Sequence, residues 1–80
     1  MRSSKLGAFR RPEPVTIIMN GASREVAERT TIAALLAELD LRPQQVAVEV
    51  NRVVVPRAGH ATYVLSNQDA VEIVTLVGGG

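Results

Sequence analysis

The sequence has 80 residues, 46% of them hydrophobic, with one Phe, one Tyr, no Trp and no Cys. A chain this short forms one domain, which buries only about 60% of the surface that its unfolded chain exposes. The absence of cysteine excludes a disulfide framework and a thiolate nucleophile. The single histidine, His60, cannot by itself form a zinc site of the usual kind. The scarcity of aromatic rings disfavours proteins that stack the bases of nucleic acids.

Charge is distributed unevenly along the chain, although the net charge is only +1. Residues 1–14 contain four basic residues and one acidic residue, whereas residues 15–80 contain five arginines and seven acidic residues, a formal charge of −2. A short basic segment is typical of a solvated, disordered chain end. No apolar run approaches the roughly 18 residues that a membrane-spanning helix requires. We therefore expect a cytoplasmic protein with a basic leader over residues 1–14.

The first predicted element after the leader is a β-hairpin. Residues 15–20, VTIIMN, are rich in β-branched side chains and favour a strand. Asn20–Gly21 is among the strongest signals for a two-residue hairpin turn, because both residues tolerate positive φ. Residues 23–28, SREVAE, then form a more polar return strand, which we place near an edge of the sheet.

A helix is predicted next, within TTIAALLAELDL at residues 30–41. Its apolar side chains recur at the helical spacing i, i+3, i+4 and i+7, which places them on one face; they are Ile32, Leu35, Leu36 and Leu39. Thr30 or Thr31 can cap its first turn, and Pro43 closes the segment. We expect about three turns, buried on one side.

A second pair of strands, joined by a short turn, is predicted after the helix. VAVEVN at 46–51 alternates between apolar and polar positions, as a half-buried strand does. Asn51–Arg52 is a candidate turn into a short strand at 53–56.

The last third of the chain is less regular before its final strand. Residues 57–65 are predicted to be irregular, with at most a single helical turn, and SNQD at 66–69 favours a turn. AVEIVTLV at 70–77 is the last strand, with Val71 and Ile73 on one face. This order predicts an α+β fold of the ubiquitin-like β-grasp type, with a mixed sheet of four or five strands packed on one main helix.

Conventional catalysis finds little support in the sequence. A Ser–His–Asp arrangement would need His60 with Ser66 or Ser23, and no segment resembles a nucleophile elbow. The acidic residues are scattered singly, and His60 is expected to be an exposed loop residue. We therefore expect a protein that is not an enzyme.

The candidate site is the terminal Gly78–Gly79–Gly80. Without Cβ atoms, these residues can thread a narrow channel and present the α-carboxylate of Gly80 to an enzyme. Adenylation by ATP would activate that carboxylate, and a sulfur nucleophile would then leave a thiocarboxylate. A frayed chain end is the alternative interpretation of three terminal glycines.

Residues 15–80 resemble the ThiS family of sulfur carriers in thiamine biosynthesis, with the small subunit of molybdopterin synthase as a more distant relative. The stretches that carry the resemblance are the strand into Asn20–Gly21, TTIAALLAEL at 30–39, VAVEVNRVVVPR at 46–57 and DAVEIVTLVGGG at 69–80. The resemblance implies that Gly80 is adenylated and thiocarboxylated while Gly78 and Gly79 thread into partner active sites. It implies that the protein binds no cofactor and that a ThiF-type adenylyltransferase, as a partner, consumes the ATP. The other implied partners are a cysteine desulfurase and a ThiG-type thiazole synthase, docked through an apolar sheet face or edge strand beside the tail.

Two departures from the family pattern concern the second half of the chain. Gln68 stands before Asp69 where the family usually has glycine, and no Trp follows Val55–Pro56–Arg57, so that His60 and Tyr63 are the nearest candidates for its place. Family members begin near the position of Val15, so we expect translation to start there from a GTG codon.

The expected domain organisation is a leader at 1–14, a β-grasp domain at 15–77 and a glycine tail at 78–80. Three other functions stay open at this point: a carrier feeding molybdopterin, a protein modifier joined through Gly80 to lysines, and an interaction module. The last would bind RNA, if at all, through the leader's basic residues, which are Arg2, Lys5, Arg10 and Arg11.

Overall fold

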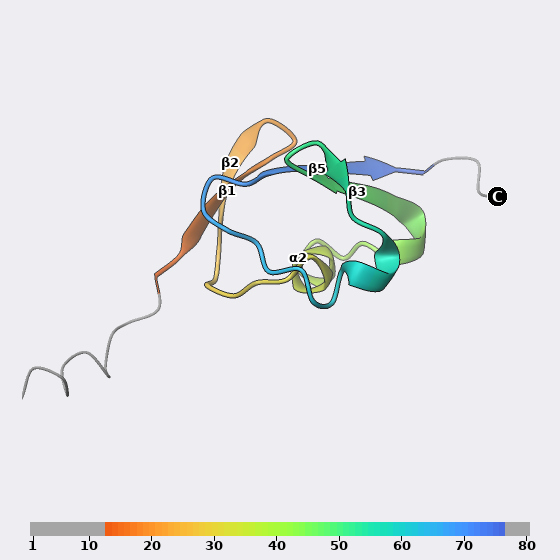
Figure 1. The fold of residues 1–80 in the computed structure, drawn as a ribbon, viewed down its shortest axis with the longest axis horizontal. Helices are drawn as coiled ribbons and strands as arrows, with labels where there is room; N and C mark the ends of the chain where they lie inside the picture. Colours follow the sequence, from red (N-terminus) through yellow and green to blue (C-terminus); the bar gives the residue numbers. More distant parts are fainter. Residues whose placement is uncertain (1–12, 77–80) are drawn as a thin grey trace, which may run out of the picture.

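In the part of the chain that the structure describes, five strands form one mixed sheet and one α-helix covers one of its faces (Figure 1). The computed structural model describes residues 13–76, so residues 1–12 and 77–80 lie outside the described part of the chain. The strand order is β2-β1-β5-β3-β4, in which β1 and β5 are parallel and the other neighbours antiparallel. The elements are β1 (Val15–Met19), β2 (Ala22–Val26), α2 (Ile32–Glu38), β3 (Val46–Val50), β4 (Val53–Val54) and β5 (Ala70–Thr75), with 3₁₀ turns at Pro43–Gln45 and Arg57–Gly59. This arrangement confirms the expected α+β architecture.

The first hairpin turns at Asn20–Gly21, as the sequence predicts. Both residues have positive φ, 50° and 86° respectively. That pair of angles fits a tight turn whose twist matches the flanking strands. Five residue pairs follow, from Met19 opposite Ala22 to Val15 opposite Val26.

Helix α2 is shorter than the three turns predicted, with seven residues. Thr31 caps its start, because the Oγ1 of Thr31 accepts a hydrogen bond from the N–H of Ala34 at 3.1 Å. Its end lies before Pro43: Asp40 has a φ of 60°, its N–H bonds to the carbonyl of Ala37, and the N–H of Leu41 bonds to the carbonyl of Leu36. This pair of bonds is a Schellman motif, with Asp40 in the left-handed position where glycine is more common. A local C-cap therefore ends the helix, and the proline does not.

The first free N–H groups of α2 are satisfied by the link over residues 57–65. The N–H of Ile32 donates to the carbonyl of Tyr63 at 3.1 Å, and the N–H of Ala33 donates to the carbonyl of His60 at 3.0 Å. Buried helix ends need such partners because the first N–H groups have none within the helix. The irregular link is therefore fixed to the helix rather than loosely attached.

His60 is buried, with only 4% of its surface exposed, which contradicts the prediction of an exposed loop residue. Its Nε2 lies 3.0 Å from the carbonyl oxygen of Val55, and its Nδ1 has no hydrogen-bond partner. The imidazole thus packs in the protein interior with one ring nitrogen against a backbone carbonyl. The sequence predicts an exposed His60, whereas the structure buries its ring beside the carbonyl of Val55.

The core lies between the sheet and α2. Val46, Val48 and Val50 point to this side from β3, which confirms the predicted alternation, and Val71 and Ile73 do so from β5. Fully burying one such side chain stabilises the fold by about 1.5–3 kcal/mol. The buried hydrophobic residues are Ile17, Val26, Ile32, Leu35, Leu36, Val46, Val48, Val50, Leu65 and Val71.

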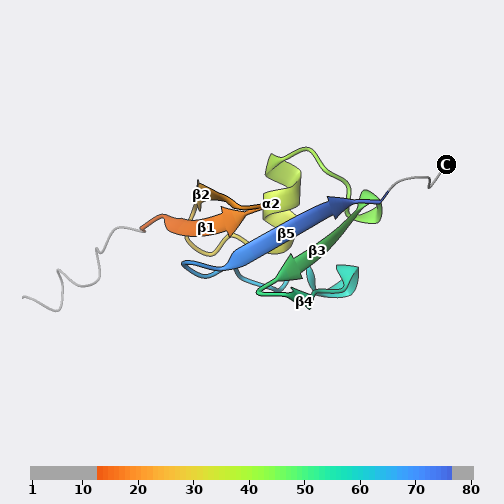
Figure 2. The same cartoon turned by 90° about the horizontal axis from the view of Figure 1, so that it is seen from above.

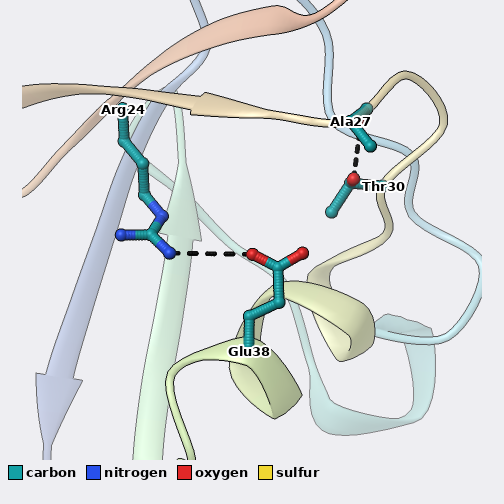
Figure 3. Close-up of polar contacts among 4 residues, drawn as sticks. All are labelled: Arg24, Ala27, Thr30 and Glu38. Atoms are coloured by element: carbon teal, nitrogen blue, oxygen red, sulfur yellow. Dashed lines mark hydrogen bonds and ion pairs between the residues drawn. The ribbon is translucent and has the colours of Figure 1, made fainter.

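An ion pair joins β2 to α2, and a hydrogen bond lies within the segment that connects them (Figure 3). The guanidinium of Arg24 reaches the carboxylate of Glu38 at 3.6 Å, and the Oγ1 of Thr30 donates to the carbonyl of Ala27 at 2.6 Å. An ion pair this exposed contributes at most about 1 kcal/mol. In the described part of the chain, no helix is long and apolar enough to span a membrane.

Candidate functional site

The predicted site residues, Gly78, Gly79 and Gly80, lie outside the described residues. What the structure describes is the strand that leads to them, β5, which is the central strand of the sheet (Figure 2). It is flanked by β1 on one side and β3 on the other. The beginning of β5 is thus paired on both sides, and the rest of the strand is paired with β3.

The turn before β5 is held by backbone and side-chain bonds to β1. The N–H of Gln68 donates to the carbonyl of Thr16 at 2.6 Å, and the N–H of Thr16 donates to the Oδ1 of Asn67 at 2.8 Å. Gln68 has a φ of 71°, a conformation that suits glycine better than glutamine. The departure from the family pattern at this position therefore leaves the turn in a glycine-like conformation with some strain in it.

Two asparagines in hairpin turns bond to the backbone of β5 from different places. The side chain of Asn51 accepts from the N–H of Ala70 at 3.0 Å and donates to the Oδ1 of Asp69 at 3.0 Å. The side chain of Asn20 accepts from the N–H of Ile73 at 2.8 Å and lies with its Nδ2 3.3 Å from the carbonyl oxygen of the same residue. Asn51 thus secures the beginning of β5, and Asn20 secures its middle.

The C-terminal end of β5 is fixed to the segment before β3. The N–H of Leu76, the last described residue, donates to the carbonyl of Gln45 at 2.7 Å. The pairing of β5 with β3 therefore continues to the point at which the description of the chain ends.

The sheet face opposite the helix combines apolar and acidic side chains from β3, β4 and β5 and from Leu76, which follows β5. Val54, Val74 and Leu76 are exposed at 60%, 53% and 53%. Glu49 and Glu72 lie directly opposite each other on β3 and β5. Like charges at such a position are destabilising, and residues 13–76 provide neither carboxylate with an ion-pair partner. Glu49 and Glu72 thus place two negative charges beside exposed apolar side chains.

Residues 13–76 contain no group of three or more His, Asp or Glu side chains placed to hold a metal ion. His60 faces the carbonyl of Val55 and contributes its own carbonyl to the helix. The side chain that a catalytic triad would need is thereby engaged within the core.

A single helix on a five-stranded mixed sheet, with the first and last strands parallel and adjacent at its centre, defines a ubiquitin-like β-grasp domain. A crystal structure of the thiamine biosynthesis protein ThiS from Geobacter metallireducens superposes with a TM-score of 0.71 at 30% identity, covering 82% of this chain and all of the other. A sequence model of the ThiS family matches residues 17–80. The chain belongs to the ThiS family of sulfur carrier proteins.

Two kinds of relative are similar to the same part of the chain. A thiazole synthase from Paramagnetospirillum magneticum is 38% identical over 64 residues, which is 80% of this chain and 20% of the synthase. The uncharacterised protein ycf40 of Porphyra purpurea is 39% identical over 67 residues, 82% of this chain and 93% of that protein. The chain thus spans about a fifth of the length of the thiazole synthases that it matches, including one from Magnetococcus marinus, and nearly all of ycf40.

Sequence patterns alone did not predict the roles of Asn20 and Asn51 in holding β5. Both are predicted to be turn residues, and their side chains bond to residues of β5 that are 53 and 19 positions further along the chain. A single signal was available: asparagine occupies the first position of both two-residue turns, where its amide projects from the hairpin tip. The partner of that amide depends on the strand order, which local patterns do not contain.

Proposed function

We propose that this protein carries sulfur for synthesis of the thiazole of thiamine, with the C-terminal carboxylate of Gly80 as the carrying group. An adenylating partner joins that carboxylate to AMP from ATP and releases pyrophosphate. A sulfur nucleophile then attacks the acyl carbon, the C–S bond forms, and the C–O bond to AMP breaks. The net change replaces one carboxylate oxygen with sulfur at the oxidation level of hydrosulfide. Because a cysteine desulfurase delivers sulfur as a persulfide, a thiol reductant must supply two electrons and is itself oxidised to a disulfide.

The observation that carries this proposal is the match of the ThiS family to residues 17–80, which include Gly78, Gly79 and Gly80. The described structure supports it, because the strand before the glycines is central, pairs with β3 along its length and with β1 at its beginning, and is hydrogen-bonded to two asparagine side chains. Because β5 is preorganised, docking this strand to a partner costs little further conformational entropy.

The catalysis in this scheme belongs to the partners. A ThiF-type adenylyltransferase binds ATP, a cysteine desulfurase supplies sulfur, and a ThiG-type thiazole synthase receives it. The thiamine pathway is favoured over molybdopterin by the similar proteins, which are a thiamine biosynthesis protein and two thiazole synthases. We propose that the protein itself holds no cofactor and acts in the cytoplasm.

The negative charge on the exposed face supports recognition of partners. Glu49 and Glu72 lie opposite each other on β3 and β5, beside exposed apolar side chains, so a basic groove would be attracted to this region. Charge complementarity of this kind chiefly raises the association rate and selects the partner.

The test is the mass of the intact protein after incubation with ATP, the adenylyltransferase, a cysteine desulfurase, cysteine and a thiol reductant. We expect a gain equal to the mass difference between sulfur and oxygen, located on the peptide that ends at Gly80. A variant lacking Gly80 is the matched control and should gain nothing. No gain in the complete protein, with a partner shown to be active by ATP–pyrophosphate exchange, would overturn the proposal.

A further inference from the structure

Strand β5 continues beyond the point where β1 stops pairing with it. The pairing of β1 with β5 ends at Met19 opposite Val71, because β1 turns away at Asn20–Gly21. The pairing of β3 with β5 continues to Val46 opposite Thr75. Figure 2 shows this end of β5 running on beside β3 after β1 has ended. One edge of the central strand is therefore uncovered near the tail.

The hydrogen-bond pattern shows which backbone groups face the uncovered edge. Ala70 accepts from the N–H of Asn51, and Leu76 donates to Gln45, so the even-numbered residues of β5 bond toward β3. In an antiparallel pair such bonds occur at every second residue. The N–H and carbonyl of Thr75 consequently point to the opposite side, where no partner for them exists within residues 13–76.

Asn20 occupies the edge just before this point. Its side-chain amide meets both the N–H and the carbonyl of Ile73, in place of the backbone of a neighbouring strand. The last internally satisfied position on this edge is therefore Ile73, and the first open one is Thr75, two residues further along. An incoming strand would therefore pair with β5 from Thr75 onward, after the position that Asn20 occupies.

The side chains around the open position favour an apolar partner segment. Val74 and Leu76 flank Thr75, point to the face opposite the helix, and are each 53% exposed. In a strand paired at Thr75, the two residues flanking the pairing position would lie beside Val74 and Leu76. Exposed strand edges are common sites of recognition by strand addition, in which backbone bonds give affinity and alternate side chains give specificity.

We propose that a segment of thiazole synthase adds to the edge of β5 at Thr75 as an extended strand with apolar side chains, in line with β1. This inference rests on the proposed function. Thiazole synthase is the partner chosen because two thiazole synthases contain a segment similar to this chain within their own polypeptides. Pairing at Thr75 would hold β5 extended immediately before the glycines and so direct them toward the synthase.

The first experiment measures amide hydrogen exchange of the complete chain by NMR, alone and with saturating thiazole synthase from the same organism. We expect slower exchange of the Thr75 N–H, by tenfold or more, on binding. The N–H of Val74 bonds toward β3 in the free protein and serves as the internal control. Unchanged exchange at Thr75 in the bound state would overturn the proposal, and so would Thr75 protection by self-association without the synthase.

A second experiment removes the donor. Thr75→Pro deletes an N–H that β3 does not use, so the β3–β5 ladder keeps its bonds. We expect affinity for the synthase to fall about 5- to 10-fold, the effect of losing one net hydrogen bond. Thr75→Val keeps the N–H and should bind as the parent does. Equal affinity of the two variants, measured by calorimetry after confirming that both are folded, would contradict the proposal.

Failure here is distinguishable from failure of the proposed function. Sulfur loading at Gly80 is measured by mass in the absence of the synthase. A chain that loads sulfur normally but shows no protection at Thr75 would retain the carrier function and lose only this mode of docking.

Discussion

The hairpins β1–β2 and β3–β4 turn in the same way, but they are stabilised differently. Each turns through two residues of positive φ, Asn20–Gly21 at 50° and 86° and Asn51–Arg52 at 53° and 72°. The first hairpin has five residue pairs and the second has two. Glycine adopts its conformation at no steric cost, whereas a left-handed arginine costs about 1–2 kcal/mol.

The difference shows that one hairpin is specified locally and the other by its surroundings. The first has a favourable turn sequence and enough pairs to hold its register. The second is short and has an unfavourable second turn residue, so it depends on contacts with β5. Asn51 supplies these, since its backbone N–H donates to the carbonyl of Ala70 at 2.7 Å and its side chain bonds to Ala70 and Asp69.

The largest effect is expected for Asn51→Ala. The change removes two side-chain hydrogen bonds and places alanine at a positive φ, which alanine tolerates less well than asparagine. The free energy of unfolding should therefore fall by about 3 kcal/mol. Asn51→Gly tolerates the conformation without making the bonds and should lose about 2 kcal/mol. Urea unfolding of both variants measures the values. Equal losses of stability for Asn51→Ala and Asn51→Gly would mean that the left-handed conformation does not affect the free energy of unfolding.

Asn20→Ala should have a smaller effect, about 2 kcal/mol, because one of its two bonds is long at 3.3 Å. The hairpin should persist through its own pairs, whereas the N–H of Ile73 should exchange faster with solvent. Amide exchange of Ile73 and of the β1–β2 pairs distinguishes these outcomes. A loss of stability greater than that of Asn51→Ala would reverse the proposed order of dependence.

Much of the fold was predictable because its signals are local. The alternation of Val46, Val48 and Val50 and the Asn20–Gly21 turn each correspond to a periodicity or a backbone preference contained within a few residues. The sequence predicts that the helix continues toward Pro43, whereas α2 ends at Glu38. The left-handed conformation of Asp40 ends it, and aspartate is less common there than glycine. His60 was misplaced because its burial depends on a carbonyl of Val55 and on the packing of a whole link.

The site was predictable in a different way. Gly78, Gly79 and Gly80 were identified from the type of residue and the family resemblance, and they lie outside the described residues. The arrangement around β5 depends on the strand order: only with β5 between β1 and β3 does Asn51 bond to its beginning and Asn20 to its middle, with an open edge at Thr75. Contacts that span 19 or 53 residues leave no local pattern.

Gly21→Ala tests the local specification of the first hairpin. No atom lies within 4 Å of a Cβ added there, so the change introduces only the cost of a left-handed alanine, about 1 kcal/mol. Gly59→Ala is the matched control, because its Cβ would make an ordinary contact of 3.5 Å with Val55 Cγ1 and its φ is not in the left-handed range. Thermal unfolding should separate the two variants, and equal losses would contradict the argument from φ.

Arg52→Gly should act in the opposite direction and slightly stabilise the second hairpin. Glycine removes the left-handed cost of about 1–2 kcal/mol but adds conformational entropy to the unfolded chain worth about 0.4–1 kcal/mol, which leaves a net gain of about 0.5 kcal/mol. Arg52→Lys keeps both the charge and the conformational cost and should change nothing. If Arg52→Lys raised the free energy of unfolding by the same amount, removal of the guanidinium, and not relief of the left-handed conformation, would be the cause. A gain for Arg52→Gly alone would show that this turn forms despite its second residue, because Asn51 and β5 hold it in place.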